Sequence, residues 1–67
     1  MKELNFKHNL QVLRKECRLS QKELAKMVNV DQRTVSAWEN GICEPSFTVL
    51  LQLCNIFKVD TEELLTK

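Results

Sequence analysis

The sequence predicts an all-α protein, a compact bundle of five short helices. Hydrophobic residues make up 43% of the 67 residues and there is one glycine and one proline, which favours packed helices over a turn-rich β fold or disorder. Apolar residues also recur at the three- and four-residue spacing of amphipathic helices. Two of these segments follow a Ser or Asp with Glu three positions later, the pattern of a capping box. We expect one domain over residues 1–67, with its core between about residues 6 and 65.

The first helix is predicted over residues 6–17. Its apolar side chains form a single stripe at positions i, i+4, i+7 and i+11, namely Phe6, Leu10, Leu13 and Cys17. Val12 lies off this stripe, so we expect it at the surface. Arg18 then occupies the position at which the chain reverses.

Two helices joined by a tight turn are predicted between Leu19 and Gly41. Ser20 and Glu23 cap the first helix, over about residues 21–27, because each side chain accepts a bond from an unpaired backbone N–H. Asp31 caps the second helix, over residues 32–40, and Gly41 supplies the positive φ that ends it. The expected buried residues are Leu24, Ala25, Val28, Val35 and Trp38. A helix pair of this kind places its second helix in the major groove of DNA.

The last two helices follow a loop that ends at Pro45. Ser46 caps the fourth helix, which extends to residue 55 or 57. Its apolar side chains cover a broad face, which predicts a largely buried helix. They are Phe47, Leu50, Leu51, Leu53, Cys54 and Phe57. Lys58 and Val59 form a second reversal. Asp60 and Glu63 repeat the capping box and open a short fifth helix over about residues 61–65, which packs Leu64 and Leu65.

The segment from residue 19 to residue 41 resembles the helix-turn-helix of the phage repressor and Cro family, also called the XRE-type family. The matching stretches are Leu19-Ser20-Gln21, Glu23-Leu24-Ala25, Val30, Thr34-Val35-Ser36 and Trp38-Glu39-Asn40-Gly41. The resemblance extends from about residue 6 to residue 65 and implies a lambda-repressor-like DNA-binding domain. Arg18 and Lys58 depart from it, since relatives usually carry glycine at these two reversals.

The resemblance implies a role for individual residues on DNA. The positions that commonly face the bases are Gln32, Arg33, Ser36 and Ala37. Gln can pair with adenine and Arg with guanine through two hydrogen bonds each, whereas Ala37 offers only a methyl group. The implied phosphate contacts are Gln21, Thr34, Asn40 and Arg14. In some relatives the residue matching Arg14 pairs with the acid matching Glu39. The alternative interpretation for the base-reading residues and for Arg14 is that they are solvated surface side chains.

The loop after the second helix of the pair departs from the family. Relatives commonly carry Lys or Arg there, whereas this chain has Ile42, Cys43 and Glu44, so we expect fewer phosphate contacts and weak binding by a monomer. Ile42 either lies at a dimer contact or folds over Trp38 as part of the core. We expect a two-fold homodimer whose interface includes residues from this loop and from the last two helices, namely Ile42, Cys43, Val49, Thr61 and Leu65.

Composition excludes several other classes of function. Residues 1–40 carry eight basic and five acidic side chains, a net charge of +3, and residues 41–67 carry −2, so the helix pair lies in the basic half. The three cysteines are Cys17, Cys43 and Cys54; their odd number argues against a disulfide framework, and no pair has zinc-ligand spacing. We expect Cys54 in the core. There is no Gly-rich phosphate loop, catalytic triad, membrane-length apolar run or secretory signal. We therefore expect no enzymatic activity, no cofactor and no metal, in a cytoplasmic protein of bacterial or phage origin.

These observations predict a sequence-specific transcriptional regulator that binds double-stranded DNA and represses from a pseudo-palindromic operator. Repression is the simplest mechanism, because the chain leaves no room for an effector domain. The alternative is a protein-interaction module, such as an antitoxin whose helical face covers a toxin.

Overall fold

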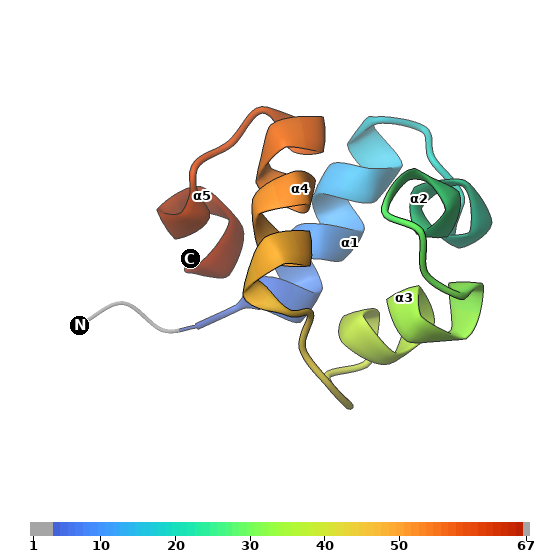
Figure 1. The fold of residues 1–67 in the computed structure, drawn as a ribbon. Coiled ribbons are helices and arrows are strands. Elements are labelled where there is room, and N and C mark those ends of the chain that lie inside the picture. Colours follow the sequence, from blue (N-terminus) through green and yellow to red (C-terminus); the bar gives the residue numbers. More distant parts are fainter. Residues whose placement is uncertain (1–3, 67) are drawn as a thin grey trace.

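The computed structural model describes residues 4–66, and the elements it forms there are five α-helices (Figure 1). They are α1 (Phe6–Glu16), α2 (Gln21–Met27), α3 (Gln32–Glu39), α4 (Phe47–Phe57) and α5 (Thr61–Leu65). The predicted all-α bundle is confirmed, and each boundary lies within two residues of the sequence prediction. Helices α2 and α3 pack together on one side of the molecule and α5 lies on the opposite side, with α1 in contact with both α3 and α5.

Side-chain caps begin four of the helices, as the sequence predicts. Ser20 accepts a hydrogen bond from the Glu23 backbone N–H at 3.0 Å, and the Ser20 N–H donates to Glu23 Oε1 at 2.8 Å. Asp60 and Glu63 form the same reciprocal box before α5, and Ser46 accepts from the Val49 N–H at the start of α4. These bonds satisfy backbone donors that have no partner within the helix.

Left-handed residues make the reversals between helices. Arg18 has φ 57°, Asn29 58° and Lys58 55°, and Gly41 has φ 73° where α3 ends. Only Gly41 adopts this conformation without a steric cost, and Asn tolerates it better than Arg or Lys. The structure therefore confirms the predicted reversals at Arg18 and Lys58.

Every helix contributes one aliphatic side chain with less than 2% of its surface exposed. These are Leu10, Leu24, Val35, Leu53 and Leu64, which belong to one buried cluster that also contains Trp38, Phe57 and Cys54. Truncating such a side chain to alanine costs about 2–5 kcal/mol, a large part of the stability of a domain this small.

Two predictions about packing are wrong. Helix α4 is not largely buried, because Phe47 and Leu51 are 70% and 45% exposed. They are one turn apart on the helix and share an outward face. Cys17 does not extend the stripe of α1, because the helix ends at Glu16 and Cys17 is an exposed C-cap residue.

Hydrogen bonds join the two ends of the described chain. Leu4 and Thr66 form an isolated antiparallel bridge, and the Asn5 N–H donates to the Leu65 carbonyl at 2.8 Å. Asn9 Nδ2 of α1 lies within hydrogen-bond distance of three carbonyl oxygens at the end of α5, those of Glu63, Leu64 and Thr66 at 3.3, 3.0 and 2.9 Å. These bonds fix α5, which has only five residues, against α1.

Candidate nucleic-acid interface

The four predicted base-reading residues lie together on the outward side of α3. Gln32 and Arg33 are exposed at its first turn, and Ser36 and Ala37 are half-buried one turn later. Asp31 orders this start of the helix, because its carboxylate accepts a hydrogen bond from the Arg33 backbone N–H at 2.7 Å. The exposed side chains of Gln32 and Arg33 therefore extend into solvent from a helix whose first turn is held by its cap.

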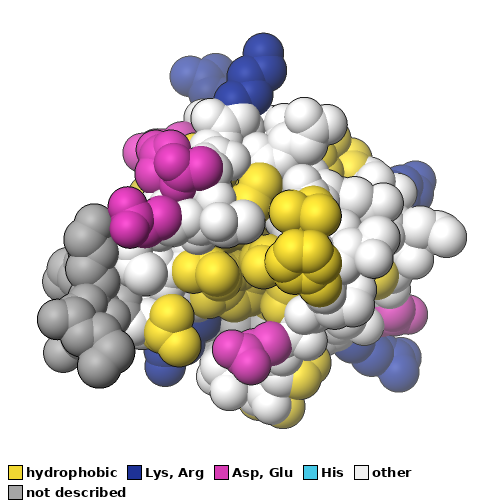
Figure 2. Space-filling model, turned by 60° about the vertical axis from the view of Figure 1, so that its left-hand side comes forward, with side chains coloured by type: hydrophobic (Ala, Val, Ile, Leu, Met, Phe, Trp, Pro, Cys, Tyr) yellow, Lys and Arg dark blue, Asp and Glu magenta, His cyan; other side chains and the backbone are white. Residues whose placement is uncertain are grey.

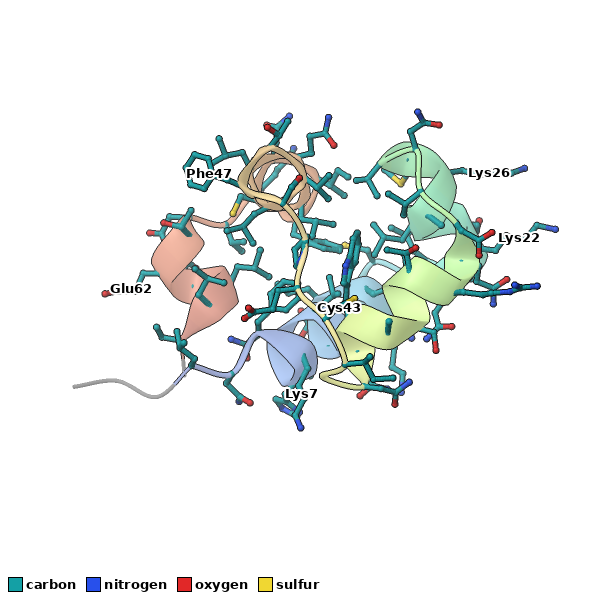
Figure 3. The ribbon with its side chains drawn as sticks, turned by 60° about the horizontal axis from the view of Figure 1, so that its bottom comes forward. Lys7, Lys22, Lys26, Cys43, Phe47 and Glu62 are labelled. Atoms are coloured by element: carbon teal, nitrogen blue, oxygen red, sulfur yellow. The ribbon has the colours of Figure 1, made fainter. Side chains whose placement is uncertain are left out.

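An open groove runs between α2 and α3, and all four of these residues line it. Its remaining lining comes from α2, from the turn before α3 and from the loop after it: Gln21, Lys22, Ala25, Lys26, Val30, Asp31 and Ile42. Lys22 and Lys26 are one helical turn apart, and both point away from the body of the protein (Figure 3). The groove thus combines hydrogen-bonding groups on α3 with positive charge on α2, which suits the edge of a DNA duplex.

A buried ion pair holds the last turn of α3. Arg14 Nε and one guanidinium nitrogen, Nη2, donate to the two carboxylate oxygens of Glu39 at 2.6 and 3.1 Å, and Nη1 donates to the Leu19 carbonyl at 2.8 Å. The side chains of Arg14 and Glu39 are only 11% and 3% exposed. Gln21 Nε2 donates to the same Glu39 carboxylate at 3.1 Å. One carboxylate therefore connects α1, α2 and α3 and fixes the orientation of α3.

The predicted phosphate-contacting residues divide into two kinds. Asn40 is exposed and Thr34 and Gln21 are half-buried, whereas Arg14 is buried and bonded as described above. Asn40 Nδ2 donates back to the Ser36 carbonyl at 2.9 Å, which fixes its side chain against the end of α3. The predicted Arg14–Glu39 pair is present, and the contacts of all four residues with DNA stay predictions.

The structure contradicts one of the two interpretations of Ile42, and the dimer contact stays a prediction. Its side chain is 77% exposed while Trp38 is 2% exposed, so Ile42 does not cover the core. Among the other residues predicted at the dimer contact, Cys43 and Thr61 are exposed and Val49 and Leu65 are half-buried. The sequence did not reveal Phe47 as a candidate for the contact. It is the most exposed of the large hydrophobic side chains of α4, and helical periodicity shows which face is apolar but not what covers that face.

Two pKa shifts are connected with this architecture. The backbone N–H of Ser20 and then its hydroxyl lower the pKa of the Glu23 carboxyl below its ordinary value of 4.5. Burial, followed by the nearby negative charge of Asp60, raises the pKa of the Cys54 thiol above 9.0. Within residues 4–66, no group of His, Cys, Asp or Glu side chains could hold a metal ion, and no helix could span a membrane.

A short turn between two packed helices, the second with its polar face exposed, defines the helix-turn-helix class of proteins. This chain belongs to the helix-turn-helix family, whose model matches residues 10–64. The predicted resemblance is thereby confirmed. No curated protein sequence matches the chain.

Several solved structures share the fold. A transcriptional regulator from Listeria innocua is 32% identical with a TM-score of 0.90, and the match covers 94% of this chain but 59% of that one. The c2 repressor of P22, solved in complex with a synthetic operator, is 30% identical with a TM-score of 0.84, over 90% of this chain and 91% of that one. The restriction-modification controller protein C.AhdI from Aeromonas hydrophila is 30% identical with a TM-score of 0.78, over 88% and 89%.

The same fold also forms part of an enzyme. Hydroxypropylphosphonic acid epoxidase from S. wedmorenis is 26% identical with a TM-score of 0.81, over 90% of this chain and 32% of that one. The fold alone therefore does not distinguish a regulator from one part of a larger enzyme.

Proposed function

We propose that this chain is a transcriptional regulator that binds double-stranded DNA, reads the major groove with α3 and acts as a repressor. The family and the two regulators of similar length support the DNA-binding function. The observation that carries the proposal is the position of the four base-reading residues on one groove, while the buried Glu39 network fixes the last turn of the same helix.

Repression follows from occupancy of the DNA. A bound domain with α3 in the major groove prevents polymerase from using the same stretch of duplex. The charge distribution supports this orientation, because the basic half of the sequence contains α2 and α3 and the acidic half contains α4 and α5.

Selection of bound duplexes from a random DNA pool tests the proposal. Wild-type protein should recover a pseudo-palindromic site, and the double variant Gln32→Ala with Arg33→Ala should bind it at least about tenfold more weakly, since a bidentate base contact contributes about 1–3 kcal/mol of discrimination. His8→Ala, which truncates an exposed side chain of α1 outside the groove and the proposed dimer face, is the control. Unchanged binding by the double variant would contradict base reading by α3.

We also propose that the active form is a homodimer joined through α4 and α5. Figure 2 shows hydrophobic side chains gathered at the centre of this face, with acidic side chains beside them. Leu4, Phe47 and Leu51 are 75%, 70% and 45% exposed, and a shallow apolar groove is lined by Leu4, Phe6, Glu44, Pro45, Phe47, Leu50 and Leu65. Exposed apolar surface of this kind is typical of an interaction site.

A two-fold dimer has a testable geometry. Two copies of α3 would read half-sites about 34 Å apart, one turn of DNA. Phe47→Asp should yield monomers in sedimentation experiments and weaken binding to the two-half-site duplex more than to a single half-site. Val12→Asp changes an exposed side chain of α1 and should leave the mass unchanged. Selected sites without two-fold symmetry would argue against the dimer.

We further propose that the chain acts without catalysis and without a cofactor. The residues of the groove have hydrogen-bonding and electrostatic roles that DNA binding uses in full. Reproducible turnover of any substrate by the pure chain would overturn this.

A further inference from the structure

Lys7 of α1 crosses the backbone at the point where α3 ends. A methyl group placed on Gly41 would lie 3.1 Å from Lys7 Cδ and 3.5 Å from Lys7 Nζ, so the lysine stem packs over the glycine. Figure 3 shows Lys7 reaching the edge of the molecule beside the loop that carries Cys43. Gly41 is the only glycine of the chain, and a side chain there would both strain its φ of 73° and displace Lys7.

The end of α3 has no positive charge of its own. Its last turn contains no basic residue, and the following loop of Ile42, Cys43 and Glu44 adds one acidic side chain. The carbonyl groups at a helix C-terminus carry a partial negative charge, which attracts an ammonium group. An exposed lysine also keeps N–H donors for another acceptor, and no partner for the Lys7 ammonium is found among residues 4–66.

Lys7 also borders the surface that faces DNA in the proposed function. A second hollow, which Lys7 lines with Trp38, Gly41 and Ile42, shares Ile42 with the groove between α2 and α3. Positive charge is therefore present on two sides of α3, from Lys22 and Lys26 of α2 and from Lys7 of α1 (Figure 3).

We propose that Lys7 binds a phosphate of the DNA backbone at the C-terminal end of α3. The ammonium reaches from α1 across Gly41 and supplies the charge that the loop after α3 lacks. This inference rests on the proposed function and adds a contact from a helix outside the helix-turn-helix. It contributes affinity without base specificity, because phosphates are the same at every base pair.

The test is the salt dependence of binding to the duplex recovered by selection. Each lysine–phosphate contact contributes about −0.9 to the slope of log K against log salt concentration, so the loss of one contact makes the slope shallower by about 0.9. Lys7→Met keeps the length of the stem and removes the charge, so its slope should be about one unit shallower, with equal loss of affinity on point variants of the site. Lys7→Arg should restore the slope. Lys58→Met removes an exposed charge at the C-cap of α4, outside both hollows, and should leave the slope unchanged.

The outcomes distinguish a failure of the Lys7–phosphate contact from a failure of DNA binding as a whole. An unchanged slope in Lys7→Met overturns the phosphate contact. If the melting temperature of that variant is lower as well, the role of Lys7 is limited to stabilising the end of α3. No binding of any duplex by the wild type at low salt overturns the proposed function together with this inference. Circular dichroism of each variant shows whether a change in binding comes from unfolding.

Discussion

Removing the Glu39 carboxylate should destabilise the whole domain and disorganise its recognition helix. The change Glu39→Ala deletes the acceptor of two Arg14 bonds and one Gln21 bond and leaves a guanidinium 11% exposed without its counter-charge. Breaking a buried ion pair from one side costs about 3–5 kcal/mol. For a domain of this size each kcal/mol lowers Tm by about 4–8 °C, so we expect a drop of at least about 12 °C.

Thermal unfolding followed by circular dichroism measures this effect, and a double-mutant cycle assigns it to the pair. The cycle consists of Arg14→Met, Glu39→Leu and their combination. Because the combination replaces both charges with apolar groups, it should be more stable than either single variant and should recover much of the stability that each of them loses. Glu16→Ala removes an exposed carboxylate of α1 and should change the free energy of unfolding by less than about 0.5 kcal/mol. A loss below about 1 kcal/mol in Glu39→Ala would refute the view that this carboxylate holds the three helices together.

Three further predictions concern the backbone and the titrating groups. Arg18→Gly and Lys58→Gly should each raise the free energy of unfolding in urea by up to about 1 kcal/mol, because they relieve left-handed conformations at non-glycine residues, and an unchanged midpoint would contradict this. The lowered pKa of Glu23 means that its contribution to stability is complete above about pH 4.5 and is lost as the pH falls through the folded-state pKa; Glu23→Gln should lack this component of acid unfolding. The Cys54 thiol, buried and with a raised pKa, should react with a thiol reagent only as fast as the protein unfolds, whereas the two exposed thiols react at once.

Local patterns in the sequence determine most of the architecture. Capping residues and apolar periodicity give all five helices, and the positions after the first and fourth helices predict the chain reversals at Arg18 and Lys58. These features depend on residues within a few positions of one another, so the sequence is sufficient to predict them. The groove residues on α3 follow in the same way, because a helix that buries Val35 and Trp38 must expose its other side.

Contacts between distant segments could not be predicted in this way. The apolar face of α4 is visible in the sequence, but its partial exposure at Phe47 depends on where α5 and the chain ends lie. The packing of Lys7 over Gly41 joins residues 34 positions apart, and the bonds from Asn9 to α5 join residues at least 54 apart. Neither pair has a local signature. Among the contacts between distant segments, only the Arg14–Glu39 pair, 25 positions apart, could be predicted, and that prediction came from resemblance to a known family.

The bridge between Leu4 and Thr66 has a consequence for anything attached to this domain. Both ends of the described chain emerge side by side near α5, on the side of the molecule away from α2 and α3 (Figure 1). A fused segment at either end would therefore start beside the apolar face of α4 and α5 and not beside the groove. Such fusions should alter self-association sooner than they alter the choice of DNA site, so a tag used for purification belongs on a removable linker in any measurement of oligomeric state.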